Sequence, residues 1–226
     1  LCRFIGSKQY SNIFVLTDEN THEHCLPLLV SHLDEECHFH HLNISPGEGS
    51  KSVMTCYEIW SEMLEADTDR SSVLVNLGGG VVTDIGGFIA STFKRGIDYI
   101  NVPTSLLAMV DAALGGKTGI NLNQVKNQIG VFCDPVALVV EMEFLKTLPG
   151  EQLIAGFAEV LKYALITDEE MFNKIELAIS VGNGPKDVIT EELINNCIHI
   201  KSAIAKEDPT EKGHRKVLNF GHTIGH

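Results

Sequence analysis

The segment LNFGHTIGH, residues 218 to 226, carries two histidines four residues apart. On a helix, His222 and His226 would lie on one face, about 6 Å apart along the axis, because each residue rises about 1.5 Å. This spacing is typical of metal ligands, and imidazole is a ligand of zinc. Two ligands do not complete such a site, so another must come either from upstream or from beyond His226.

A candidate partner is the carboxylate of Glu159, in the segment GFAEVLKYALI. Its neighbours are mostly apolar, and an isolated charge there is costly, so Glu159 should be paired, protonated or bound to metal. An ion pair with Lys162, three residues on, is the simpler interpretation. Alternatively, Glu159 and His222 would supply two ligands suited to zinc.

Two glycine-rich segments are candidate anion sites. In NLGGGVVTDIGG, three glycines between a strand and a helix would let the backbone approach a phosphate at the helix N-terminus; a tight turn without a ligand is the alternative. In VDAALGGKTGINLNQVKNQIG, Lys117, Lys126 and Asn127 lie among glycines and apolar residues, as anion-binding side chains would. Surface lysines on turns are the alternative, especially for Lys126. Downstream, Arg215 and Asn219 precede His222 at intervals of about one helical turn.

Composition excludes several classes of partner. The chain has 30 acidic and 17 basic residues, a net charge of −13, so sequence-independent binding to nucleic acid or an anionic membrane is not expected. It lacks an uninterrupted apolar run of membrane-spanning length and a leader pattern, and we expect a cytoplasmic protein. The six cysteines occur singly, which argues against a zinc finger and for reduced thiols. The N-terminal histidines, in THEHC and HFHHL, are interpreted as structural.

The elements that must position these residues alternate along the first half of the chain. Apolar β-rich runs are typical of a parallel sheet covered on both faces, and amphipathic stretches between them predict helices, which together indicate an α/β fold. After residue 150 the pattern is entirely helical. We therefore predict an α/β domain over residues 1–150 and a helical domain that begins at residue 151. The predicted strands cover 12–20, 37–45, 71–80, 98–105 and 135–143, and the predicted helices 50–66, 81–93, 151–166, 168–180 and 187–208.

A series of motifs from about Asp18 to His226 resembles the 3-dehydroquinate synthase family. The motifs are GGGVVTDIGGFIASTFKRG, VPTSLLAMVDAALGGKTGIN, KNQIG, GFAEVLKYALI and LNFGHTIGH, in this order. The resemblance implies a Rossmann-like NAD-binding domain with a parallel sheet, followed by an all-helical domain that binds metal and substrate and is incomplete here. It also implies zinc or cobalt as the metal and a homodimer.

The resemblance assigns roles residue by residue. Glu159 and His222 match metal ligands, a third ligand being a histidine downstream of this chain, whereas His226 matches a residue near the substrate phosphate. Arg95 matches an arginine that reaches the neighbouring subunit's substrate. The NAD contacts would be Asp18, Glu48, Lys51, Gly78, Gly79, Gly80, Asp84, Thr104, Ser105, Phe144 and Thr147; Ser105 stands where the family usually has threonine. Asp111 and Lys126, which are also assigned to the cofactor, would lie close to the substrate. The substrate contacts would be Lys117, Asn127, Lys162, Lys201, Arg215 and Asn219.

The implied reaction converts 3-deoxy-D-arabino-heptulosonate 7-phosphate to 3-dehydroquinate and phosphate, a step of the shikimate pathway. The substrate is a small sugar-phosphate acid, and NAD is regenerated in the reaction. Two alternatives remain. One is another NAD- and metal-dependent sugar-phosphate cyclase or a glycerol-dehydrogenase-like oxidoreductase, although an oxidoreductase would not need so many anion-binding residues. The other is a catalytically inactive NAD-binding fragment.

Overall fold

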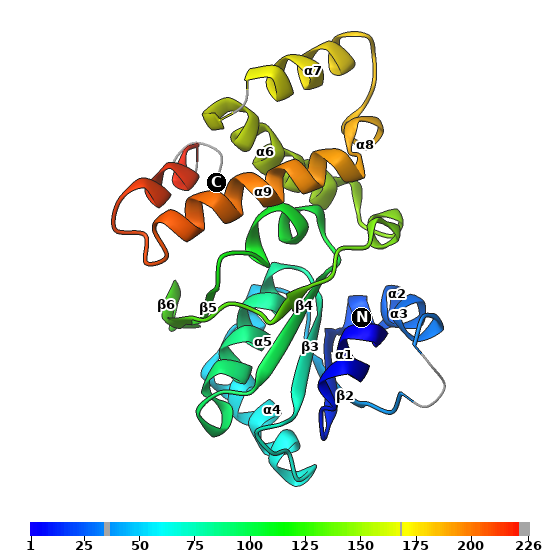
Figure 1. Cartoon of the computed structure of the whole chain (residues 1–226), viewed down its shortest axis with the longest axis vertical. Coiled ribbons are helices and arrows are strands. Elements are labelled where there is room, and N and C mark those ends of the chain that lie inside the picture. Colours follow the sequence, from blue (N-terminus) through cyan, green and yellow to red (C-terminus); the bar gives the residue numbers. More distant parts are fainter. Residues whose placement is uncertain (34–36, 168, 222–226) are drawn as a thin grey trace.

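The computed structural model describes residues 1–33, 37–167 and 169–221, and its centre is a five-stranded parallel sheet (Figure 1). The strand order is β2-β1-β3-β4-β7. Leu16 of β1 is aligned with Leu42 of β2 on one side and with Asn76 of β3 on the other. The strands are β1 (Ile13–Asp18), β2 (His40–Ile44), β3 (Val73–Gly78), β4 (Asp98–Pro103) and β7 (Ala137–Leu138). The predicted α/β fold with a parallel sheet is confirmed.

Both faces of the sheet are buried, as the apolar strands predict. Phe14 and Leu16 pack on one face with helices α4 (Val53–Glu65) and α5 (Gly80–Thr92). Val15 points to the opposite face, because successive side chains of a strand alternate. The helices beside that second face in the N-terminal part are α1 (Cys2–Lys8), α2 (Glu19–His24) and α3 (Leu26–Ser31).

An antiparallel hairpin was not predicted. The strands β5 (Lys117–Leu122) and β6 (Val125–Phe132) form it where the sequence indicated only a glycine-rich loop. Gly119 and Gly130 face each other across the hairpin, and a Cβ on Gly119 would lie 2.7 Å from the backbone oxygen of Ile129. The glycines therefore allow close strand pairing, and the hairpin packs against α5.

After β7, every regular element in the described part of the chain is helical. The elements are η4 (Met142–Lys146), α6 (Gly150–Thr167), α7 (Glu169–Ser180), α8 (Pro185–Val188), α9 (Glu191–Glu207) and η5 (His214–Asn219). The predicted helix 187–208 is interrupted because Thr190 is extended and caps α9 by accepting a hydrogen bond from the Leu193 amide. The apolar core is continuous from Leu106 to Phe157 and Ile194, so the helical part packs directly on the α/β part.

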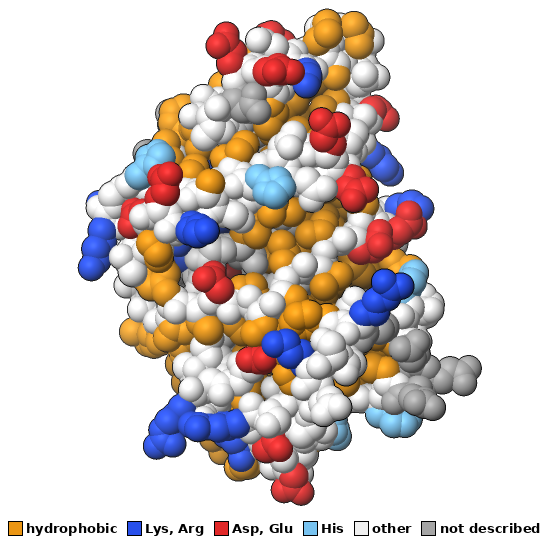
Figure 2. All heavy atoms as spheres, in the orientation of Figure 1, with side chains coloured by type: hydrophobic (Ala, Val, Ile, Leu, Met, Phe, Trp, Pro, Cys, Tyr) orange, Lys and Arg blue, Asp and Glu red, His pale blue; other side chains and the backbone are white. Residues whose placement is uncertain are grey.

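The remaining short elements differ modestly from expectation. The predicted strand 135–143 is reduced to two paired residues, since the chain then turns into η4, whose first turn is capped by the Glu141 carboxylate. Three further short helices are η1 (Glu48–Ser50), η2 (Phe93–Arg95) and the π-helix η3 (Ala108–Ala112). In the described residues, no helix is long and apolar enough to cross a membrane. On the face shown in Figure 2, acidic and basic side chains are interspersed.

Candidate functional site

The glycine turn lies at the carboxyl end of β3 and opens a cavity of about 690 Å³. β3 ends at Gly78 and α5 begins at Gly80. A Cβ on Gly78 would lie 2.5 Å from the Val82 side chain, and one on Gly80 would lie 3.2 Å from Ala112 Cβ. Because these glycines have no side chain, the backbone of the turn lies close to Val82 and Ala112. The free N–H groups in the first turn of α5 attract anions.

Most of the predicted NAD contacts surround this cavity. Asp18 caps α2, its Oδ1 accepting from the Thr21 amide at 2.8 Å, and it also lines the cavity. The capping role and the predicted binding role are therefore compatible. The other predicted contacts that line it are Glu48, Lys51, Gly79, Gly80, Asp84, Thr104, Ser105, Phe144 and Thr147.

Lys51 reaches the inner end of the cavity. Its Nζ donates to Asp84 Oδ2 at 2.7 Å and to Asn127 Oδ1 at 2.6 Å, and the residue is only 4% exposed. Burial raises the pKa of Asp84, although the charge of Lys51 opposes this shift. Lys51 thus connects a predicted NAD contact with a predicted substrate contact.

A second cavity of about 610 Å³ adjoins the first, and both are lined by Asp84 and Ala112. Its walls come from β5, β6, α9 and η5, elements that are distant in the sequence. The predicted residues that line it are Asp111, Lys117, Asn127, Lys201, Arg215 and Asn219. The fold therefore brings together most of the predicted substrate contacts.

Asp111 and Lys201 form an ion pair at one wall of the second cavity. Lys201 Nζ lies 2.7 Å from Asp111 Oδ1 and 2.6 Å from its backbone oxygen, and the Tyr163 hydroxyl donates to the same Oδ1 at 2.8 Å. Burial alone would raise the pKa of Asp111, but the charges of Lys201 and Lys162 and these hydrogen bonds lower it. Burial lowers the pKa of Lys201, and Asp111 opposes that shift.

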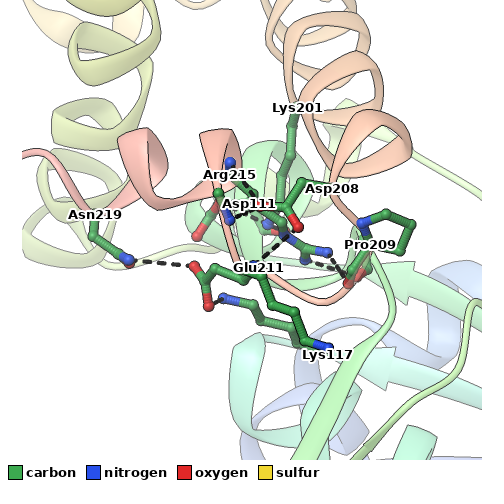
Figure 3. Close-up of polar contacts among 11 residues, drawn as sticks. Asp111, Lys117, Lys201, Asp208, Pro209, Glu211, Arg215 and Asn219 are labelled. Carbon is green, nitrogen blue, oxygen red and sulfur yellow. Dashed lines mark hydrogen bonds and ion pairs between the residues drawn. The ribbon is translucent and has the colours of Figure 1, made fainter.

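Arg215 also lines the second cavity, and only 1% of its surface is exposed. Figure 3 shows its guanidinium beside Pro209. Its Nη1 donates to the Pro209 backbone oxygen at 2.9 Å, and its Nη2 donates to the Gly115 backbone oxygen at 2.7 Å. Its Nε has no hydrogen-bond partner among the described residues. A guanidinium that is buried beside backbone oxygens gives the cavity wall a fixed positive charge.

Glu159 and Lys162 form a buried ion pair on α6, with Lys162 Nζ also 4.9 Å from the centre of the Tyr163 ring. The simpler interpretation of their spacing is therefore the arrangement that is present. Neither residue lines the second cavity. Within the described ranges, no three His, Cys, Asp or Glu residues are grouped as a metal site, and His222 and His226 lie outside those ranges. Among the described residues, Glu159 would therefore supply one of the three protein ligands that a catalytic zinc centre takes.

Other predicted residues lie elsewhere. Arg95 is exposed at the end of η2, and Lys126 is exposed on β6; neither lines either cavity. Gly78, a predicted NAD contact, is the last residue of β3 and lines neither cavity. The His22 and His41 rings stack with centroids 4.6 Å apart, and the latter also hydrogen-bonds to a threonine, in agreement with a structural interpretation.

Glu211 was missed by the sequence analysis. It lines the second cavity, and its carboxylate contacts Lys117 and Asn219 (Figure 3). An acidic residue in a polar turn resembles any solvated surface residue, so the sequence contained no local signal. Only the position of the turn over the cavity distinguishes it.

The fold and the site define an α/β protein with a glycine turn at a helix N-terminus and an adjoining cavity lined by three cationic and three acidic side chains. Residues 41–155 match the model of the 3-dehydroquinate synthase N-terminal region, and residues 156–226 match that of the C-terminal region. The chain therefore belongs to the 3-dehydroquinate synthase family. It is 41% identical over 229 residues to the 3-dehydroquinate synthase of Parabacteroides distasonis, an alignment that covers 99% of this chain and 62% of that protein. The chain thus spans less than two thirds of this relative.

Two solved structures of other synthases share the fold of this chain. A 2-deoxy-scyllo-inosose synthase complexed with carbaglucose-6-phosphate, NAD+ and Co2+ is 27% identical, with a TM-score of 0.86 over 100% of this chain and 64% of that one. The 2-epi-5-epi-valiolone synthase of Streptomyces hygroscopicus, with NAD+ and Zn2+ bound, is 28% identical, with a TM-score of 0.83 over 93% of this chain and 59% of that one.

Proposed function

We propose that this chain is the NAD-binding part and the beginning of the metal- and substrate-binding part of a 3-dehydroquinate synthase. Residues 1–150 would bind NAD, and residues 151–226 would begin the helical domain. The proposed reaction converts 3-deoxy-D-arabino-heptulosonate 7-phosphate to 3-dehydroquinate and phosphate. Family membership favours this reaction over a glycerol-dehydrogenase-like oxidation.

The observation that carries the proposal is the pair of adjoining cavities. One is built on a glycine turn at a helix N-terminus, which suits a pyrophosphate. The other holds a cluster of three cations, Lys117, Lys201 and Arg215, and is also lined by three acids, Asp84, Asp111 and Glu211. A substrate with a carboxylate and a phosphate matches such a cluster, because lysine and arginine bind both groups by charge-assisted hydrogen bonds.

The side chains of the second cavity would bind and orient the substrate. Lys201 uses two N–H groups on Asp111, which fixes the direction of its third. Arg215 is held in place by two backbone oxygens. Because these cations are already oriented, little conformational entropy is lost when an anion binds to them. Lys117 is the most exposed of the three cations, at 44%, and is paired with Glu211.

The first cavity would hold NAD, with Gly79 and Gly80 beside the pyrophosphate and Asp18, Glu48 and Lys51 beside the adenosine ribose, because these residues line it. When bound, NAD would supply a hydride acceptor that later returns the hydride, so it would not be consumed. Asp84 lines both cavities and accepts a hydrogen bond from Lys51, so this pair would lie beside the place where the dinucleotide meets the substrate. Thr104, Ser105, Phe144 and Thr147 would line the rest of this site.

A divalent metal is part of the proposal, supported by the cobalt and zinc in the related synthases. When bound, it would acidify a substrate hydroxyl. Glu159 is the described candidate ligand, and it would have to exchange Lys162 for the metal. His222 and a histidine beyond this chain would complete the proposed ligand set. His226 would lie near the substrate phosphate and would not bind the metal. Chelation should abolish turnover by the full-length enzyme, and zinc or cobalt should restore it; full activity without metal would contradict the assignment.

We also propose that the protein is a homodimer in which Arg95 reaches the second subunit. Its proposed location is the cytoplasm. The direct test is an assay of the full-length protein with the heptulosonate phosphate, measuring phosphate release and 3-dehydroquinate formation. Stoichiometric NAD binding without either product would instead support the alternative of an inactive NAD-binding module.

A further inference from the structure

Glu211 lies on a turn that is anchored firmly over the second cavity. The turn joins α9 to η5, and the Asp208 carboxylate accepts hydrogen bonds from the Lys212 amide at 2.9 Å and the Gly213 amide at 2.7 Å. The backbone of Glu211 itself is left-handed, with φ 56°, which is uncommon for a residue other than glycine. The conformation of the turn therefore directs the Glu211 side chain toward the second cavity.

Both oxygens of the Glu211 carboxylate are used inside the cavity (Figure 3). Oε2 accepts from Lys117 Nζ at 2.5 Å, and Oε1 accepts from Asn219 Nδ2 at 3.2 Å. Lys117 begins β5, whereas Asn219 ends η5, so the carboxylate joins two different walls of the cavity. An anion that accepted from the same two N–H groups would have to replace the Glu211 carboxylate.

We propose that Glu211 is an internal ligand of the anion site: it positions Lys117 and Asn219 in the empty cavity and is displaced when an oxyanion binds. The displacement itself does not depend on the proposed function. The identification of the oxyanion as the substrate's phosphate or the product phosphate does rest on it. The displacement lowers the affinity for small anions, and it favours release of phosphate because the carboxylate returns to Lys117.

The electrostatics of the turn support this role. Burial would raise the pKa of Glu211, but hydrogen bonds from Lys117 and Asn219 and the charges of Lys117 and Arg215 lower it, so the carboxylate is charged at neutral pH. Glu211 and Lys117 are 21% and 44% exposed, and an ion pair with this exposure is weak enough for a ligand to displace.

The test is a calorimetric titration of the chain with inorganic phosphate. Glu211→Gln keeps the shape and removes the charge, so phosphate should bind about three- to fivefold more tightly, the range that a partly exposed ion pair is worth. Glu211→Asp is one methylene shorter and should also bind phosphate more tightly. Glu207→Gln is the matched control, because it removes one exposed acid from the end of α9 that faces His214. Its phosphate affinity should change by less than about 1.5-fold, since solvent screens that charge.

Lys117→Met distinguishes displacement from a general charge effect. In that background, Glu211→Gln should no longer tighten phosphate binding, because the contact that it frees is missing. Weaker binding in Glu211→Gln, or a change equal to that of Glu207→Gln, would overturn the inference. The titration does not depend on turnover. If the full-length protein forms 3-dehydroquinate but Glu211→Gln does not bind phosphate more tightly, only this inference is refuted. If Glu211→Gln binds phosphate more tightly but the full-length protein forms no 3-dehydroquinate, only the proposed function is refuted.

Discussion

Lys51 and Asp84 form an ion pair at the junction of the two cavities, with Lys51 Nζ 2.7 Å from Asp84 Oδ2. Lys51→Met should lower the free energy of unfolding by about 2 kcal/mol, because it leaves the Asp84 carboxylate in a largely enclosed position without its partner. It should also weaken NAD binding. Urea denaturation and equilibrium NAD titration measure the two effects.

The control for this change is Lys146→Met, which removes an exposed lysine from a pair with Glu143. Exposed pairs contribute little, so the loss should be below about 0.5 kcal/mol. Equal losses in the two variants would show that the Lys51 pair has no special role in stability.

Asp111 should make stability dependent on acid pH. Its folded pKa is lowered from the ordinary value of 3.8, so its stabilising contribution is present above about pH 4 and is lost as the pH falls further. Asp111→Asn should therefore be less stable at pH 7, and its stability should fall less steeply below pH 4. Urea denaturation at pH 7, 4 and 3 compares the slopes, and parallel curves would contradict the assignment.

Lys117→Met should reduce turnover of the full-length enzyme by about 100-fold, the effect of losing one well-placed charge-stabilising group. NAD affinity should change by less than about twofold, because Lys117 lines only the second cavity. Steady-state kinetics and NAD titration separate the two quantities. A comparable loss of NAD affinity would mean that this segment belongs to the dinucleotide site.

Gly156 allows α6 to approach the α/β part closely. A Cβ at this position would lie 2.5 Å from the Leu107 backbone nitrogen and 2.7 Å from Leu106 Cβ. Gly156→Ala should therefore lower the free energy of unfolding by about 2 kcal/mol, through overpacking. Gly6→Ala on α1 is the matched control, since no atom lies within 4 Å of the added Cβ, and it should be neutral or stabilising by up to about 1 kcal/mol. Urea denaturation measures both changes, and equal stability would refute the close contact.

The sequence by itself determined the order and type of most elements. The strands β1, β3 and β4 are mostly apolar, because both faces of a parallel sheet are buried, and this pattern can be recognised in the local sequence. The hairpin β5–β6 was not readable, since nearly all of β6 is exposed and its apolar residues do not alternate with polar ones as in a half-buried strand. The glycine turn could be predicted from the sequence, because its chemistry depends on consecutive residues.

The second cavity was decided by the tertiary structure. The motif resemblance named Lys117, Lys201 and Arg215, but nothing in their spacing places them on one cavity, because they lie on β5, α9 and η5. The pairing of Glu159 with Lys162 depended on burial as well as on helical spacing. Glu211 carried no sequence signal, since its role arises from where an anchored turn meets Lys117, 94 residues away. Local backbone and burial preferences are encoded in neighbouring residues, whereas contacts between distant charges exist only after the sheet and the helical layer have packed together.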